Sequence, residues 1–184
     1  RLLLFGIFFG KESMTIFVDD KEIKAEKGQT VIEAMTAAGI DLPHFCWHPA
    51  LSVAGNCRMC LVEIGNEHTD EDGNKSIRWI PKLQIGCATP VSEGMHVRAS
   101  SEKVLKARRG VMEFILINHP LDCPICDEAG ECKLQDYAVK HSIGESRFTE
   151  EKAHKPKRVE WSDKIIYDGE RCIMCSRCIR FAKE

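Results

Sequence analysis

Residues 119–132 read HPLDCPICDEAGEC, from His119 to Cys132, and so place one imidazole and three thiols in one short stretch. Soft and borderline donors at the spacing H-x3-C-x2-C-x5-C are typical of a metal site. The two-residue gap between Cys123 and Cys126 lets both sulfurs face one centre. Three thiolates and one imidazole also suit a structural zinc ion, so this stretch alone does not identify its metal.

The composition of the chain limits the classes of protein to which it belongs. Of its 184 residues 43% are hydrophobic and 29% charged, which is typical of a globular protein of one or two domains. The formal net charge of -2 gives no indication of a nucleic acid partner. Ten cysteines are present, which is unusually many for a protein of a reducing compartment and requires a reason.

The cysteines and one histidine fall into three groups along the chain. The first, second and third groups are Cys46, Cys57, Cys60 and Cys87; His119, Cys123, Cys126 and Cys132; and Cys172, Cys175 and Cys178. Disulfide bonds are the usual alternative for a cysteine-rich chain. However, C-x2-C recurs four times, a spacing that brings thiols together on a metal. We therefore interpret the thiols as reduced ligands in a reducing compartment.

The third group has the spacing C-x2-C-x2-C, which is the core of the [4Fe–4S] loop of bacterial ferredoxins. Three thiolates at this spacing suit one cubane cluster. Two-cluster ferredoxins have a further Cys followed by Pro, at a place where this sequence has Ala182. The fourth ligand is therefore expected beyond Glu184, or the site is incomplete.

The first group has the spacing C-x10-C-x2-C-x26-C, and four thiolates with one distant member fit a [2Fe–2S] site. The spacing differs from the plant type, C-x4-C-x2-C, and so disfavours a photosynthetic-type ferredoxin. A zinc site of four thiolates is the alternative, which we rank lower because the [4Fe–4S] motif lies in the same chain. Gly55 and Gly86 flank these cysteines and let backbone N–H groups approach the cluster sulfurs.

Apolar periodicity predicts a small α+β domain around the first group. A strand at 15–19, a turn and a strand at 22–25 lead to a helix at 31–38. Thr30 and Glu33 form a capping box at the start of this helix, and Gly39 ends it. The remaining strands are expected at 60–64, 77–85 and 95–98, with a polar turn at 65–76. A hairpin packed on one helix indicates the β-grasp frame of [2Fe–2S] ferredoxins.

The second half of the chain is predicted to be mainly helical. Apolar spacing indicates a helix at 101–117 that ends just before His119, and a short helix follows at 132–141. Arg108 and Arg109 are expected on the solvated face of the first of these helices. The later segments are a charged linker at 147–158, a short strand or extended segment at 163–168 and a loop that enters a helix over 172–183.

Residues 1–10 are apolar but shorter than the roughly 20 residues of a membrane span, and no signal-peptide cleavage site follows them. Met14 directly precedes the first strand and is the expected native start.

Four segments are expected in all. They are an upstream or disordered stretch at 1–13, a [2Fe–2S] ferredoxin-type domain at 14–100, a His/Cys-ligated [4Fe–4S] domain at 101–158 and the start of a further [4Fe–4S] domain at 159–184.

The order of the three groups resembles the N-terminal iron–sulfur region of the large peripheral-arm subunit of NADH:quinone oxidoreductase, respiratory complex I. The phrases CRMCLVE at 57–63 and DCPICDEAGEC at 122–132 are similar to that family, and the likeness covers nearly all of the chain from Met14. It implies a [2Fe–2S] cluster on Cys46, Cys57, Cys60 and Cys87, a [4Fe–4S] cluster on His119, Cys123, Cys126 and Cys132, and a second [4Fe–4S] cluster begun by Cys172, Cys175 and Cys178.

The resemblance also implies a function. The chain would pass electrons from NADH oxidation toward quinone through these clusters, without a complete catalytic site of its own. Its partners would be other peripheral-arm subunits, including the NADH- and flavin-binding subunit, with no nucleic acid and no direct membrane insertion. The expected location is the cytoplasmic side of a bacterial inner membrane, or the matrix side of a mitochondrial one.

Two other functions stay open at this point. The first is an accessory electron-transfer domain of an [FeFe]-hydrogenase, of the diaphorase of an NAD-linked hydrogenase or of a formate dehydrogenase. Those proteins usually continue with a complete two-cluster ferredoxin, against which Ala182 argues. The second is a zinc scaffold without redox activity. In either iron–sulfur interpretation, Phe45 and Trp47 beside Cys46 are expected to shield the first cluster.

Overall fold

The structure, a computed structural model, describes residues 12–184. Its helices are α1 (Val31–Ala37), α2 (Glu102–Leu116), α3 (Lys133–His141) and α4 (Arg177–Lys183), with a 3₁₀ turn η1 (Cys123–Ile125). Its strands are β1 (Ser13–Val18), β2 (Lys21–Glu26), β3 (Leu61–Thr69), β4 (Lys75–Trp79), β5 (Gln84–Ile85), β6 (Met95–Arg98), β7 (Val159–Glu160) and β8 (Ile166–Tyr167). The first strand starts one residue before the expected domain start at Met14, and most of the upstream segment lies outside the described residues.

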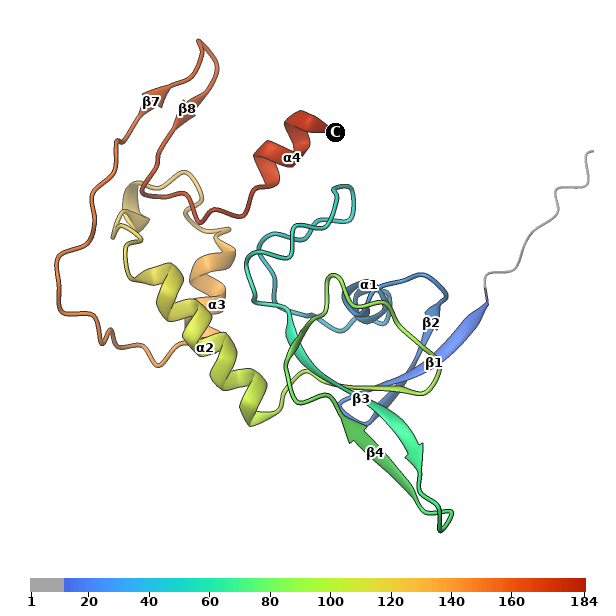
Figure 1. Cartoon of the computed structure of the whole chain (residues 1–184). Helices are drawn as coiled ribbons and strands as arrows, with labels where there is room; N and C mark the ends of the chain where they lie inside the picture. Colours follow the sequence, from blue (N-terminus) through green and yellow to red (C-terminus); the bar gives the residue numbers. More distant parts are fainter. Residues whose placement is uncertain (1–11) are drawn as a thin grey trace, which may run out of the picture.

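The N-terminal part of the chain is a mixed sheet covered by α1. The strand order is β2-β1-β6-β3-β4, with β5 paired to β3. β1 and β6 are parallel, whereas the other pairs are antiparallel. Alternate residues of the strands are buried with the apolar face of α1, as period-2 and period-3.6 patterns require. Figure 1 shows α1 lying across one face of the sheet.

The capping box predicted at the start of α1 is confirmed. The backbone N–H of Thr30 donates to Glu33 Oε2 at 2.7 Å, so that the Glu33 side chain satisfies a donor at the helix end. Gly39 follows the helix with a φ of +71°, a conformation that favours glycine. This fixes the direction in which the chain leaves α1 toward Cys46.

Two of the predicted strand boundaries were wrong. β3 continues to Thr69 inside the predicted polar turn, because an edge hairpin holds polar side chains on its solvated faces. The turn itself is short, and Asp70 Oδ1 accepts the N–H groups of Asp72 and Asn74. The predicted strand at 77–85 is interrupted after Trp79, because Pro81 has no N–H for a ladder and only Gln84 and Ile85 resume pairing.

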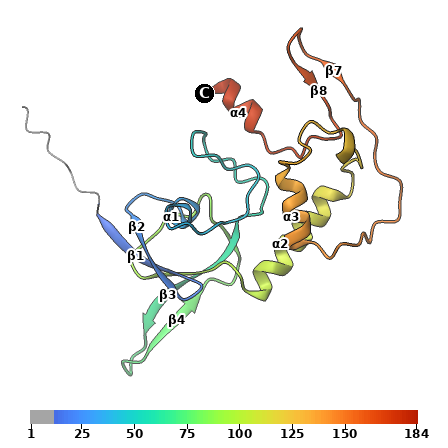
Figure 2. The same ribbon diagram turned by 180° about the vertical axis from the view of Figure 1, so that it is seen from behind.

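The second part of the chain packs α2 and α3 against the loop of the first group. The Ser101 side chain caps α2 by accepting the N–H of Val104 at 3.4 Å, and α3 follows the second group. A separate apolar cluster joins the two helices to this loop, through Phe45, Met59, Met112, Leu134 and Tyr137. Seen from behind, α2 and α3 lie side by side, and α2 also contacts β3 of the sheet (Figure 2).

The short strand or extended segment predicted at 163–168 contains β8. The prediction missed β7, at Val159–Glu160, which pairs with β8 in a small antiparallel hairpin. The residues of its strands are exposed or half-buried, and the rings of Trp161 and Tyr167 stack with their centroids 4.5 Å apart. Within residues 12–184, none of the helices has both the length and the apolar character needed to cross a membrane.

Gly86 offers a test of this packing, because its position next to Cys87 leaves no room for a methyl group. A Cβ there would lie 2.6 Å from Leu42 Cδ2 and 3.2 Å from the carbonyl oxygen of Cys60. Leu42 is buried, so we expect Gly86→Ala to lower the stability by about 1–3 kcal/mol, measured as the denaturation midpoint.

Gly110→Ala is the matched control. Gly110 lies inside α2, and a Cβ there meets no atom within 4 Å. The substitution should leave the midpoint unchanged or raise the stability by roughly 0.5–1 kcal/mol. An unchanged midpoint in Gly86→Ala would contradict the described packing around Cys60 and Cys87.

Candidate metal-cluster sites

The four thiols of the first group meet at one place between the sheet, α1 and the loop before β3. The Cys46 sulfur is in hydrogen-bonding contact with Cys57 and Cys87, and Cys87 also contacts Cys60. Cys46, Cys60 and Cys87 are buried and Cys57 is half-buried. The cysteines that the sequence assigned to one site are therefore adjacent, although β3, β4 and β5 separate Cys87 from Cys60 in the sequence.

Contact between the thiols changes their acidity. The hydrogen bond from the Cys57 thiol, followed by that from Cys87, lowers the pKa of Cys46. The same contacts raise the pKa of Cys57 and of Cys87. The pKa of Cys60 falls to about 7, chiefly because Cys87 donates to it. Thiolate formation, which metal binding requires, is thus favoured at Cys46 and Cys60.

Backbone N–H groups point at these sulfurs. The N–H of Phe45 donates to Cys57 Sγ at 3.4 Å, and the Cys46 sulfur accepts from the N–H groups of Asn56 and Cys57. Gly55 and Arg58 have φ values of +63° and +62°, which turn successive amides of this loop inward. Buried thiols surrounded by N–H donors fit an anionic iron–sulfur cluster, whose sulfurs need such donors.

The surroundings of the first group are apolar on one side and cationic on another. Phe45 and Trp47 are buried beside Cys46, as the shielding role predicted from the sequence requires. The prediction that Arg108 lies on a solvated face was wrong. Its side chain is 3% exposed, and Nε and a terminal nitrogen donate to the carbonyls of Met59 and Leu61 at 3.1 and 3.0 Å. Arg109 is exposed, as predicted.

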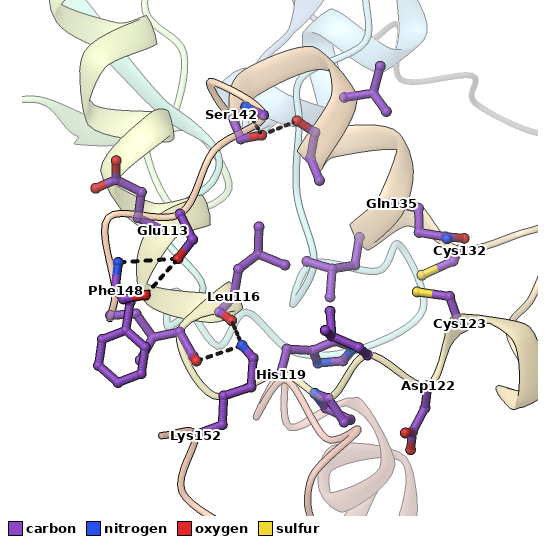
Figure 3. A pocket seen from close by; sticks show the side chains of 18 of the residues that line it. Glu113, Leu116, His119, Asp122, Cys123, Cys132, Gln135, Ser142, Phe148 and Lys152 are labelled. Carbon is purple, nitrogen blue, oxygen red and sulfur yellow. Dashed lines mark hydrogen bonds between the residues drawn. The ribbon is translucent and has the colours of Figure 1, made fainter. Parts of the chain in front are cut away.

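The second group lines a cavity of about 790 Å³ between α2, α3 and the segment that follows α3. His119, Cys123, Cys126 and Cys132 all contribute to its wall. Figure 3 shows the sulfurs of Cys123 and Cys132 facing each other, with the imidazole of His119 in the same cavity. The wall therefore contains every residue that the sequence assigned to the second site.

Helix α2 positions the histidine. It ends at Leu116, and the N–H of His119 donates back to the Leu116 carbonyl at 3.3 Å. Burial, followed by the nearby charge of Lys152, lowers the pKa of His119. This shift favours the neutral imidazole, and the neutral form is the one that coordinates a metal.

The third group lies in the loop that leads from β8 into α4. Cys172 Sγ accepts the N–H of Met174 at 3.4 Å, and Tyr167 makes a side-chain hydrogen bond with Cys172 that raises the Tyr167 pKa. Met174 and Ser176 have φ values of +55° and +59°, which coil the loop tightly between its cysteines. In the part of the chain that is described, no three His, Cys, Asp or Glu side chains are arranged to hold a lone metal ion.

Charged side chains hold the third group against the second. Arg171 Nε and Lys157 Nζ both contact Asp122 Oδ2, the former at 3.1 Å. Lys157 also pairs with Glu170 at 3.0 Å, and this contact, followed by the hydrogen bond with His154, lowers the pKa of Glu170 to about 2. Asp122 directly precedes Cys123, so the ion pairs join the two cysteine loops.

On its other side, the third group contacts the loop of the first. Asn56 donates to the carbonyl of Met174 at 3.0 Å, and Arg177 donates to that of Trp47 at 2.7 Å. Arg180 donates to the carbonyls of Cys46 and Ser52. Figures 1 and 2 both show α4 beside the loop that precedes β3. The third group thus contacts the loops of both the first and the second.

Comparison with known proteins adds the following findings. The model of a "2Fe-2S iron-sulfur cluster binding domain" matches residues 11–102, and the model of the "NADH-ubiquinone oxidoreductase-G iron-sulfur binding region" matches residues 108–147. The G subunits of the NADH-quinone oxidoreductases of Rickettsia conorii and Rickettsia felis are 49% and 48% identical to this chain over 91% of its length. The chain spans 23% of the length of each of these relatives.

A solved structure is also similar. It is described as an NAD+-reducing [NiFe]-hydrogenase in the H2-reduced state, and it aligns with a TM-score of 0.74 at 31% identity. The alignment covers 94% of this chain and 68% of the hydrogenase chain.

Asp122 allows a test of the ion pairs between the second and third groups. Asp122→Asn removes the charge that Lys157 and Arg171 share, so we expect faster amide exchange over residues 155–171, measured by hydrogen–deuterium exchange with mass spectrometry. Asp163→Asn is the control, because Asp163 and its partner Lys164 are both largely exposed. Equal exchange in the two variants would show that these ion pairs do not hold the loops together.

Proposed function

Because the chain belongs to the family of 2Fe-2S iron–sulfur cluster binding domains and is a homologue of the G subunit of NADH-quinone oxidoreductase, we propose that it carries electrons between iron–sulfur clusters in an NADH:quinone oxidoreductase. The observation that carries this proposal is the meeting of the four thiols of the first group in a buried place lined by N–H donors. When bound, the clusters would accept and donate single electrons. The chain itself supplies ligands, burial and hydrogen bonds.

In this proposal the domain at 14–100 is a β-grasp ferredoxin domain with a [2Fe–2S] cluster on the first group. The parallel pairing of β1 with β6 and the packing of α1 on the sheet support that frame. Its four thiolates would hold two irons in the place where the thiols contact one another. Phe45 and Trp47 would exclude water from this cluster, and the exclusion of water is one of the factors that set its reduction potential.

The second group would hold a [4Fe–4S] cluster in the cavity between α2 and α3, within a domain at 101–158. The neutral His119 and three cysteines give one protein ligand per iron. The third group would supply three ligands of a further [4Fe–4S] cluster at 159–184. Since its loop contacts both other loops, electrons would pass between the first and second clusters by way of the third.

Partners and location are part of the same proposal. As a segment of a complex I subunit, the chain would contact other peripheral-arm subunits, among them the one that binds NADH and flavin. It would be associated peripherally with the membrane, on the cytoplasmic side in a bacterium. The similarity to an NAD+-reducing hydrogenase favours a second candidate, an electron-transfer domain of such an enzyme. The 49% identity to a G subunit of NADH-quinone oxidoreductase favours the first.

The cluster content tests the proposal against a zinc scaffold. Protein purified or reconstituted without oxygen should contain iron and acid-labile sulfide in the amounts of a [2Fe–2S] cluster and at least one [4Fe–4S] cluster. Zinc in the first two sites without acid-labile sulfide would overturn the redox function altogether.

His119 gives a second test, specific to the second site. A thiolate adds negative charge, so His119→Cys should lower the potential of that cluster alone, by on the order of 100 mV. His119→Ala should make the cluster labile, because one iron loses its protein ligand. Potentials come from redox titration followed by EPR, and His68→Ala, at an exposed position of the β3–β4 hairpin, is the control. If His119→Ala behaves like the control, His119 is not a ligand.

A further inference from the structure

Two buried arginines lie on either side of the first group. Arg108 comes from α2 and is 3% exposed, and Arg180 comes from α4 and is 9% exposed. They are far apart in the sequence, yet both reach the loops that hold the four thiols. Buried guanidinium groups are costly unless an opposite charge or several acceptors compensate them.

The partners of both arginines are backbone carbonyls of the cysteine loops. Arg108 binds the carbonyls of Met59 and Leu61, which flank Cys60. Arg180 binds the carbonyl of Cys46 itself, that of Ser52 and, at 3.4 Å, that of Cys175 in the third group. Within residues 12–184, neither arginine takes part in an ion pair with a carboxylate.

The Cys60 thiolate is the strongest negative influence on Arg108, whereas Arg180 interacts with the exposed carboxylate of Glu184 and with the loop of Cys46. Burial lowers the pKa of Arg108, and the Cys60 thiolate is the largest of the influences that oppose this effect. Arg180 is joined to the same site through Cys46, whose own sulfur contacts two further thiols. A cluster with four thiolates would therefore be the counter-charge of both arginines, and it becomes more negative by one electron when it is reduced.

We propose that Arg108 and Arg180 are positioning residues that raise the reduction potential of the first cluster, and that Arg180 does the same for the third. This inference rests on the proposed clusters. The guanidinium charges stabilise the reduced state more than the oxidised state, because Coulomb energy grows with the charge on the cluster. The same hydrogen bonds keep the Cys46 and Cys60 loops in place. Arg180 binds the carbonyls of both Cys46 and Cys175, so its one positive charge affects the reduction potentials of two neighbouring clusters.

The test is a redox titration of the intact protein, with each cluster followed by its EPR signal. Arg108→Met should lower the equilibrium constant for reduction of the first cluster about tenfold, which is about 59 mV for one electron. Arg180→Met should shift the first and the third clusters in the same direction. The control Arg109→Met removes an exposed arginine next to Arg108 and should shift neither.

Lysine variants separate charge from structure. Arg108→Lys and Arg180→Lys keep the positive charge but lack the several N–H donors of a guanidinium group. They should therefore restore most of the reduction potential that the Met variants lose. If Arg108→Met does not retain the cluster, the inference is tested by comparing the reduction potentials of Arg180→Met and Arg180→Lys. Met variants with full iron and sulfide and the potential of Arg109→Met would overturn the inference. Absence of a [2Fe–2S] signal from the unmodified protein would instead overturn the proposed function.

Discussion

Mutual contact between the sulfurs of Cys46, Cys57, Cys60 and Cys87 is the constraint on which the rest of the structure depends. Four thiols of one site repel each other once ionised, so the chain must hold them by other means. The sheet and α1 supply a rigid wall, since Cys60 and Cys87 belong to the same apolar core as α1. Backbone N–H groups then donate to the sulfurs, and the buried arginines donate to carbonyls of the same loops.

Two kinds of contact join the three groups. An apolar cluster around Phe45, Met59 and Tyr137 seats α2 and α3 on the first loop, and it thereby fixes where the second group can lie. Ile173 and Cys175 of the third loop pack against the same apolar cluster. The third loop is also held by polar side chains on both flanks, Asp122 toward the second group and Asn56 and Arg180 toward the first. The position of the third loop thus depends on charges and carbonyls as well as on this apolar cluster.

Sequence patterns predicted much of this arrangement. Cysteine spacing separated the three groups, and the Thr30–Glu33 capping box and the two longer helices followed from local rules. Those rules do not predict which distant strands pair. No local sequence signal indicates that β1 pairs in parallel with β6, or that β3 extends to Thr69. The position of Arg108 was predicted wrongly because helix periodicity assigns charged side chains to the solvated face. Here the carbonyls of a distant loop compensate the buried charge.

We propose that the three cysteine groups form one electron path with the third group in the middle. Spin relaxation of the reduced first cluster, measured by pulsed EPR while the other clusters are reduced one at a time, tests this most directly. Reduction of the third cluster is expected to speed this relaxation more than reduction of the second does. An equal or stronger effect of the second cluster would contradict the path.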